Sequence, residues 1–218
     1  MSASRQLLHD AEFLATAADW RQLPGGGAPE IAFAGRSNAG KSSAINALTE
    51  RAGLAFASKT PGRTRHINFF RLSSGALLAD LPGYGYARVP DGVRRHWQHF
   101  LARYLAERQP LAGLVLIMDA RHPLTALDRQ TLEWILPTGL PVHVLLAKSD
   151  KLGRAERTRA LKELRGAVAR DFPRAQISMQ LFSATKRDGV AEAQAVIASW
   201  LGNSDPLRQK ERPRCQGE

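Results

Sequence analysis

Two glycines, a lysine and a serine stand at fixed spacing in the segment GRSNAGKS, residues 35–42. They satisfy the pattern G-x-x-x-x-G-K-[ST], whose chemistry is phosphate binding. The glycines let main-chain N–H groups turn toward phosphate oxygens, Lys41 reaches the β- and γ-phosphates, and Ser42 can bind Mg²⁺. About one chain in a hundred of this length would contain the four fixed residues by chance. The segment therefore predicts a nucleotide site.

A second segment, LLAKSD, closes an apolar run with Lys148-x-Asp150. A carboxylate in this place accepts hydrogen bonds from the N1–H and 2-amino groups of guanine, whereas adenine offers neither donor. Because the wrong base leaves a buried carboxylate unpaired, this contact discriminates strongly. K-x-D alone is more often a surface charge pair. Its place after a phosphate segment favours guanine recognition, with the stem of Lys148 over the base.

Two further segments are placed to complete the site. DLPGYG, residues 80–85, has the pattern D-x-x-G, in which Asp80 lies on the Mg²⁺ side and the N–H of Gly83 meets a γ-phosphate. FSAT, residues 182–185, follows an apolar run, and its main chain could contact the guanine carbonyl. Each segment is expected at the end of a strand, where ligands gather in sheets covered by helices.

The segment KTPGRTR, residues 59–65, lies between the phosphate segment and Asp80. It is rich in turn-forming residues and lacks apolar periodicity, as expected of a loop that moves. Thr60 and Thr64 are both candidates for a second hydroxyl ligand of Mg²⁺.

These segments need a frame that brings them together. Apolar runs of strand length alternate with segments of helical period, which predicts an α/β domain whose sheet is covered by helices on both faces. Six strands are expected, at residues 31–34, 67–72, 76–80, 114–119, 142–147 and 177–182. Helices are expected after Lys41 and at residues 93–105, 125–136, 155–170 and 189–201.

The chain of 218 residues, 44% of them hydrophobic, is long enough for one well-buried domain. Residues 1–28 are interpreted as an N-terminal extension with a glycine-rich joint, 29–202 as the nucleotide-binding domain, and 203–218 as a polar, disordered tail.

The single cysteine fits a reducing compartment. The longest apolar stretch, 111–118, is too short for a membrane helix. We therefore expect a cytoplasmic protein with no membrane partner.

The net charge of +11 indicates a partner that is a polyanion, such as nucleic acid or a ribonucleoprotein. The basic residues cluster: 51–71 holds five and no acid, and 151–174 holds eight against three acids. The alternative is a generally basic composition used for solubility. We expect a monomer, because no exposed apolar stripe is left over.

The ordered set GRSNAGKS, TPGRT, DLPGYG, AKSD and FSA resembles the TrmE-Era class of GTPases. PEIAFAGRSNAGKSS, SKTPGRTRHINFF and LPGYGYA resemble more narrowly the EngB/YihA/YsxC family of bacterial ribosome-biogenesis GTP-binding proteins. The resemblance covers roughly residues 13–201. It implies a Ras-like P-loop GTPase domain with a mostly parallel sheet. It also implies a protein that binds GTP with Mg²⁺, acts late in assembly of the large ribosomal subunit, and is needed for normal cell division and septation.

The resemblance also assigns roles to individual residues. GTP binding falls to Gly35, Arg36, Ser37, Asn38, Ala39, Gly40, Lys41, Ser42, Gly62, Arg63, Thr64, Arg65, His66, Asp80, Leu81, Pro82, Gly83, Ala147, Lys148, Ser149, Asp150, Phe182, Ser183 and Ala184. Catalysis falls to Asn38, Lys41, Thr64 and Gly83. Mg²⁺ binding falls to Ser42, Thr64 and, through water, Asp80.

Three positions depart from common GTPase patterns or add to them. Ala147 stands where Asn or Thr is usual, which removes a hydrogen bond between the base loop and the phosphate loop, ~1 kcal/mol of affinity. Tyr84 replaces the glutamine that orients the attacking water elsewhere, and no arginine finger is evident, so slow hydrolysis is expected. Asn38 matches the asparagine with which TrmE-type GTPases bind K⁺. The alternative is that Asn38 bonds only within its loop and a ribosomal group completes the site.

Two functions remain open at this point. The first is a slow GTPase, stimulated by its partner, whose nucleotide state controls docking on a ribosomal precursor. The second is a GTP-binding scaffold that never uses hydrolysis. A nucleotide kinase built on the same phosphate segment is disfavoured by the guanine-binding segments.

Overall fold

The computed structural model describes residues 3–56, 66–84 and 91–202, and within them seven strands form one sheet. In sheet order the strands are β1 (Glu12–Ala17), β3 (Ile67–Arg71), β4 (Leu77–Asp80), β2 (Glu30–Gly35), β5 (Leu111–Asp119), β6 (Val142–Ala147) and β7 (Ile177–Leu181). β3 pairs antiparallel with β1 and β4, and all other neighbours are parallel. The expected α/β class with a mostly parallel sheet is confirmed.

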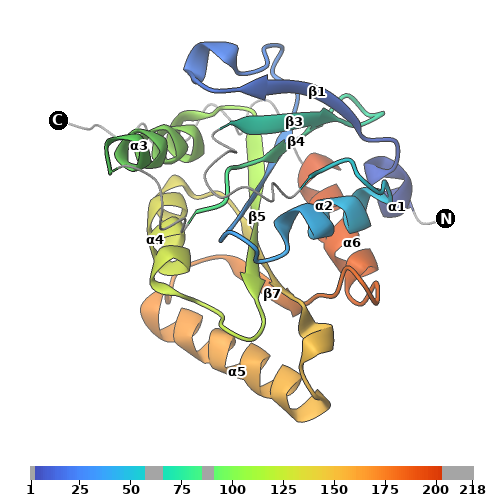
Figure 1. Ribbon diagram of the computed structural model, residues 1–218, viewed down its shortest axis with the longest axis vertical. Helices are drawn as coiled ribbons and strands as arrows, with labels where there is room; N and C mark the ends of the chain where they lie inside the picture. Colours follow the sequence, from blue (N-terminus) through green and yellow to red (C-terminus); the bar gives the residue numbers. More distant parts are fainter. Residues whose placement is uncertain (1–2, 57–65, 85–90, 203–218) are drawn as a thin grey trace.

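Helices cover both faces of the sheet (Figure 1). One face carries α3 (Asp91–Glu107), α4 (Ala126–Ile135) and α5 (Arg154–Asp171), and the other carries α1 (Ala3–Leu8), α2 (Lys41–Thr49) and α6 (Val190–Gly202). Short 3-10 turns, η1 (Trp20–Gln22), η2 (Leu136–Thr138) and η3 (Ser149–Lys151), lie between these elements. The helices expected from periodicity are all present, and α1 is additional.

The central strands are buried on both faces, which explains their unbroken apolar runs. In β2, Ala32 and Ala34 belong to the core under α3, α4 and α5, whereas Ile31 and Phe33 belong to the core under α1, α2 and α6. Every residue of β2 and of β6 is buried. The two cores thus enclose the central strands from which the loops of the site extend.

The seventh strand, β1, was not expected, because its residues were assigned to an N-terminal extension. It pairs antiparallel with β3, with Phe13 opposite Phe70 and Ala17 opposite Ile67. As an edge strand it is mostly exposed or half-buried, so its sequence EFLATA lacks the strong apolar pattern of the inner strands. Its pairing depends on β3, which lies about fifty residues later.

A buried polar cluster closes the end of the sheet where β2 begins. Glu30 is fully buried, and it accepts hydrogen bonds from the Tyr104 hydroxyl at 2.9 Å and from Arg108 Nε at 3.0 Å. Arg108 also donates to the carbonyl of Pro24 at 2.6 Å. Burial, with the neighbouring Glu30 carboxylate, raises the pKa of Tyr104 well above its ordinary value. The cluster fastens α3 to the start of β2 and to the glycine-rich joint.

The segments that the sequence predicts to bind nucleotide follow strands at the opposite end of the sheet. Because β2, β4, β5, β6 and β7 are parallel, their carboxyl ends meet at this one edge.

Among the helices in the described parts of the chain, none has both the length and the apolar character to cross a membrane.

Candidate nucleotide-binding site

The phosphate segment forms the loop between β2 and α2, as the sequence predicts. A Cβ at Gly35 would lie 2.7 Å from the carbonyl oxygen of Ile117 on β5, so glycine lets the two strands stay paired there. Gly40 precedes α2 with φ +113. Asn38 has φ +62, a left-handed conformation that is uncommon for residues other than glycine. The first N–H groups of α2 have no acceptor within the helix and are free to meet an anion.

Lys41 and Asp80 form an ion pair between the start of α2 and the end of β4. Their side chains are 12% and 5% exposed, so both charges have lost most of their water. Burial raises the pKa of Asp80, and the charge of Lys41 offsets part of that rise. The lysine expected to bind phosphate is therefore held on a carboxylate that a more strongly charged phosphate could replace.

The segment after Asp80 runs beside the phosphate loop. Leu81 N donates to the Phe33 carbonyl at 3.0 Å, and Ser37 N donates to the Tyr84 carbonyl at 2.9 Å. A Cβ at Gly83 would lie 3.4 Å from Ser37, so the two segments are close. Ser37 Oγ is the single buried side-chain polar atom without a hydrogen-bond partner in the described parts of the chain. An unpaired buried hydroxyl is costly, and it suits a loop whose bonding is completed by a ligand.

The side chain of Tyr84 contacts α4. Its hydroxyl donates to Asp128 Oδ1 at 2.7 Å, and the other oxygen of Asp128 caps α4 by accepting from Thr125 N at 2.8 Å. Burial, together with the charge of Asp128, raises the pKa of Tyr84 well above its ordinary value. The phenol is thus held in a contact with α4, and its expected failure to orient a water stays a prediction.

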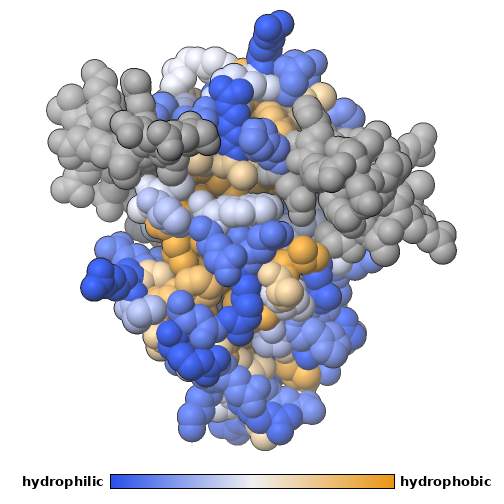
Figure 2. All heavy atoms as spheres, turned by 90° about the vertical axis from the view of Figure 1, so that its left-hand side faces the viewer, coloured by the Kyte–Doolittle hydropathy of each residue, from blue (hydrophilic) through white to orange (hydrophobic). Residues whose placement is uncertain are grey.

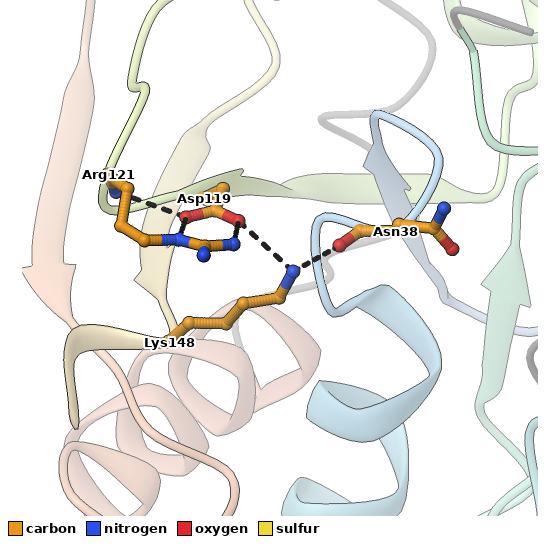
Figure 3. Close-up of polar contacts among 4 residues, drawn as sticks. All are labelled: Asn38, Asp119, Arg121 and Lys148. Atoms are coloured by element: carbon orange, nitrogen blue, oxygen red, sulfur yellow. Dashed lines mark hydrogen bonds and ion pairs between the residues drawn. The ribbon is translucent and has the colours of Figure 1, made fainter. Parts of the chain in front are cut away.

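The base loop begins at Ala147, the last residue of β6. The next residue, Lys148, has φ +60, and its Nζ donates to the main-chain carbonyl of Asn38 and, at 3.0 Å, to Asp119 Oδ2 (Figure 3). The sequence predicts that Ala147 removes a hydrogen bond between the base loop and the phosphate loop. Lys148 supplies a link between the same two loops by another route.

Asp150 lies in η3, where the sequence places the guanine-binding carboxylate. Ser183 Oγ donates to Asp150 Oδ1 at 2.6 Å, and Ser149 N donates to the Phe182 carbonyl at 3.1 Å. The hydrogen bond from Ser183 is the main cause that lowers the pKa of Asp150, so the carboxylate is ionised at neutral pH. The segments KSD and FSA, which are more than thirty residues apart, are thereby brought together.

Asp119 was missed by the sequence interpretation. It ends β5 and is 5% exposed, and its carboxylate accepts from Arg121 Nε at 2.9 Å, from an Arg121 terminal nitrogen at 2.7 Å and from Lys148. Burial alone would raise the pKa of Asp119, but these hydrogen bonds outweigh it and hold the pKa far below its ordinary value. A signal existed in the sequence: LVLIMD, like LLAD at residues 77–80, is an apolar run that ends in an acid.

The structure thus brings the phosphate loop, Asp80 to Gly83, Ala147 to Asp150 and Phe182 to Ala184 to one edge of the sheet. His66 stands directly before β3. Thr60, Gly62, Arg63, Thr64 and Arg65 lie outside the described residues, so the second Mg²⁺ hydroxyl stays a prediction.

Comparison with known proteins places this arrangement in a family. Residues 30–148, more than half of the chain, match a family model described as 50S ribosome-binding GTPase. The chain is 52% identical to the EngB GTP-binding protein of Dechloromonas aromatica over 211 residues, which cover 97% of this chain and 96% of that protein. It is 56% identical to the EngB protein of Aromatoleum aromaticum over 196 residues, 90% of each chain. This chain belongs to the EngB family of GTP-binding proteins.

Solved structures agree on the fold of this EngB-family protein. A crystal structure of an EngB protein superposes with a TM-score of 0.61 at 19% identity, over 79% of this chain and 98% of that one. Era from Aquifex aeolicus superposes with a TM-score of 0.60 at 21% identity, over 81% of this chain and 57% of that one. Both similarities show the P-loop GTPase fold, and the family is one of GTPases.

Proposed function

We propose that this protein is a slow, GTP-controlled assembly factor for the large ribosomal subunit that acts as a monomer in the cytoplasm and is needed for normal cell division and septation. The observation that carries the proposal is the convergence of the phosphate loop, Asp80 and the Asp150–Ser183 pair at one edge of the sheet. The description of the matching family as ribosome-binding supports the choice of partner, as does the net charge of +11.

Guanine nucleotide recognition is divided among the loops. Lys41 exchanges Asp80 for the β- and γ-phosphates, and the N–H groups that open α2 bind their oxygens. Asp150 reads the guanine edge, and the main chain near Ala184 meets the guanine carbonyl. The complete set proposed for GTP is the one given above for the family resemblance.

Oxygen ligands of the site suit Mg²⁺, which prefers hard donors. Ser42 lies in the first turn of α2 beside Lys41, and the Asp80 carboxylate lies at the adjoining end of β4. When bound, Mg²⁺ neutralises charge on the β- and γ-phosphates. Ser42 and Thr64 would bind the ion, and Asp80 would bind it through water.

Hydrolysis by this chain alone is expected to be slow, because the Tyr84 hydroxyl is bound to Asp128 and cannot orient a water. Asn38 is exposed, and its side-chain amide points away from Lys148 (Figure 3), so its oxygen is accessible to a second cation. We propose K⁺ for this role. Turnover is then faster in KCl than in NaCl at equal ionic strength, and Asn38→Ala abolishes that difference while it retains nucleotide binding. Equal wild-type rates in the two salts, with and without large subunits, would exclude K⁺.

The basic surface of α5 is the proposed contact for ribosomal RNA. Five basic residues of this helix are exposed: Arg154, Arg159, Lys162, Arg165 and Arg170. Figure 2, which turns the face with α3, α4 and α5 toward the viewer, shows hydrophilic residues gathered low on the molecule, where Figure 1 places α5. Such a surface neutralises RNA phosphates, and binding that releases counterions weakens steeply with salt.

The decisive experiment joins nucleotide choice to subunit binding. Titration should show GDP and GTP binding with Mg²⁺ and no comparable binding of ATP, and Asp150→Asn should shift the preference toward xanthine nucleotides. Sedimentation with large subunits should show that binding requires a GTP analogue and weakens as the salt concentration rises. In the triple variant Arg159→Ala/Lys162→Ala/Arg165→Ala, the affinity should depend less steeply on salt than in wild type. Equal affinity for ATP and GTP would refute the nucleotide assignment.

Turnover with large subunits separates the slow GTPase from the non-hydrolysing scaffold. A rate stimulated by subunits favours the GTPase. Subunit release that proceeds normally without any hydrolysis favours the scaffold.

A further inference from the structure

The carboxylate of Asp119 lies between the two halves of the nucleotide site. It ends β5, which pairs with β2 on one side and with β6 on the other. The phosphate loop follows β2 and the base loop follows β6, so Asp119 stands at the strand between them (Figure 3). It belongs to none of the segments that predicted the site.

Lys148 is the residue that Asp119 restrains. Its main chain adopts a left-handed conformation, and its flexible side chain is 32% exposed. Each bond to a neutral carbonyl such as that of Asn38 contributes little against the freedom of a long side chain. A nearly buried carboxylate 3.0 Å away adds the opposite charge that fixes the ammonium group.

We propose that Asp119 is a positioning residue for guanine nucleotide binding. It holds the Lys148 ammonium against the Asn38 carbonyl, and this keeps the base loop and the phosphate loop in register before the nucleotide arrives. The aliphatic stem of Lys148 is then already placed to receive the base. This inference rests on the GTP site proposed above.

Arg121 shares the same carboxylate and makes a second prediction possible. Its guanidinium contacts both Asp119 oxygens, and its side chain is 46% exposed. An exposed arginine can turn into water, whereas Lys148 is held at two points. Loss of Arg121 therefore leaves Lys148 as the sole side-chain cation on Asp119 among the described residues, and nucleotide affinity is retained or increased.

A double-mutant cycle tests the proposal. Asp119→Asn, Lys148→Ala and the double variant are compared with wild type for GDP affinity and for the rate at which a fluorescent guanine nucleotide dissociates. Asp119→Asn should weaken GDP binding about tenfold or more, mainly through faster dissociation. In the Lys148→Ala background the same change should have no further effect, because Asp119 acts through that lysine.

Controls separate positioning from a general loss of structure. Asp171→Asn removes a carboxylate from the ion pair with Arg129, away from the nucleotide site, and should leave GDP affinity unchanged. Arg121→Gln should bind GDP at least as well as wild type. If Asp119→Asn does not fold, Asp119→Ser, which keeps an acceptor for the Arg121 N–H, enters the same cycle.

Three results would overturn the proposal: unchanged affinity in the Asp119 variant, losses that add in the double variant, or an equal loss in Arg121→Gln. Failure of the wild-type protein to bind GDP would instead refute the proposed function. A wild type that binds, combined with an additive cycle, refutes only the role of Asp119.

Discussion

The two ends of the sheet use buried charge in different ways. At the amino end of β2, Glu30 accepts hydrogen bonds from Tyr104 and Arg108, so the buried carboxylate and both donors are paired. At the carboxyl end, Lys41 sits on Asp80 and Ser37 Oγ has no partner among the described residues. The first cluster is complete without a ligand, and the second leaves bonding capacity that a ligand can use.

Both loops of the nucleotide site contain a residue in the left-handed conformation, although Asp10, before β1, and Glu50, after α2, adopt it too. Asn38 and Lys148 have positive φ, and both lie at the carboxyl end of the sheet. Such conformations cost free energy and persist where the surrounding structure enforces them. The comparison teaches that one end of this sheet serves stability and that the other gives up some stability for binding.

The largest effect is expected at the amino end. Glu30→Ala leaves Arg108 and the Tyr104 hydroxyl without their carboxylate, and it should lower the free energy of unfolding by about 3–5 kcal/mol. Denaturant unfolding of the ligand-free protein measures this loss. Glu107→Ala, which removes an exposed pair with Arg103 on the same helix, should cost less than about 1 kcal/mol. Equal losses in the two variants would contradict the structural role of the Glu30 cluster.

The next effect concerns binding at the carboxyl end. Lys41→Ala should lower GTP affinity by about a hundredfold, because it removes charged hydrogen bonds to phosphate. Its cost in unfolding free energy should be smaller than that of Glu30→Ala. Burial already raises the pKa of Asp80, and the loss of Lys41 raises it further, so protonation of that carboxyl becomes easier and relieves part of the cost. Calorimetric titration and denaturant unfolding measure the two quantities. A stability loss as large as that of Glu30→Ala would remove the distinction between the ends.

A smaller effect is expected for Tyr84, whose contact at the carboxyl end is complete. Tyr84→Phe removes one hydrogen bond to Asp128 and should lower the free energy of unfolding by about 1 kcal/mol. Intrinsic GTP turnover should stay within about twofold of wild type, because the hydroxyl takes no part in the reaction. A large fall in turnover at unchanged GTP affinity would show that the hydroxyl acts in hydrolysis.

The smallest effect is the acid dependence of stability. Because folding lowers the pKa of Asp119, its contribution is complete well above the ordinary carboxyl pKa of about 4 and is lost as the pH falls below that value. The pKa of Asp80 is raised by folding, so the contribution of Asp80 to stability increases as the pH falls. Unfolding free energies at pH 5, 4 and 3 should therefore fall less steeply in Asp119→Asn than in wild type. Parallel curves would mean that Asp119 is not stabilised as an ion.

Contiguous sequence by itself determined much of this protein. All fixed residues of the phosphate loop lie within 35–42, and Lys148 and Asp150 are two residues apart, so their chemistry is visible without knowledge of the fold. The inner strands were predictable because burial on both faces demands unbroken apolar runs. The helices were predictable because one apolar side must repeat with the helical period.

Tertiary structure decided what depends on residues far apart in the chain. The edge strand β1 has a weak pattern of its own and exists through pairing with β3. Tyr84 contacts Asp128, and Lys148 contacts Asp119. Both contacts form only because the parallel strands bring their carboxyl ends to one edge of the sheet. Side-chain partners across such distances are set by strand order and register, which a local pattern of residues does not contain.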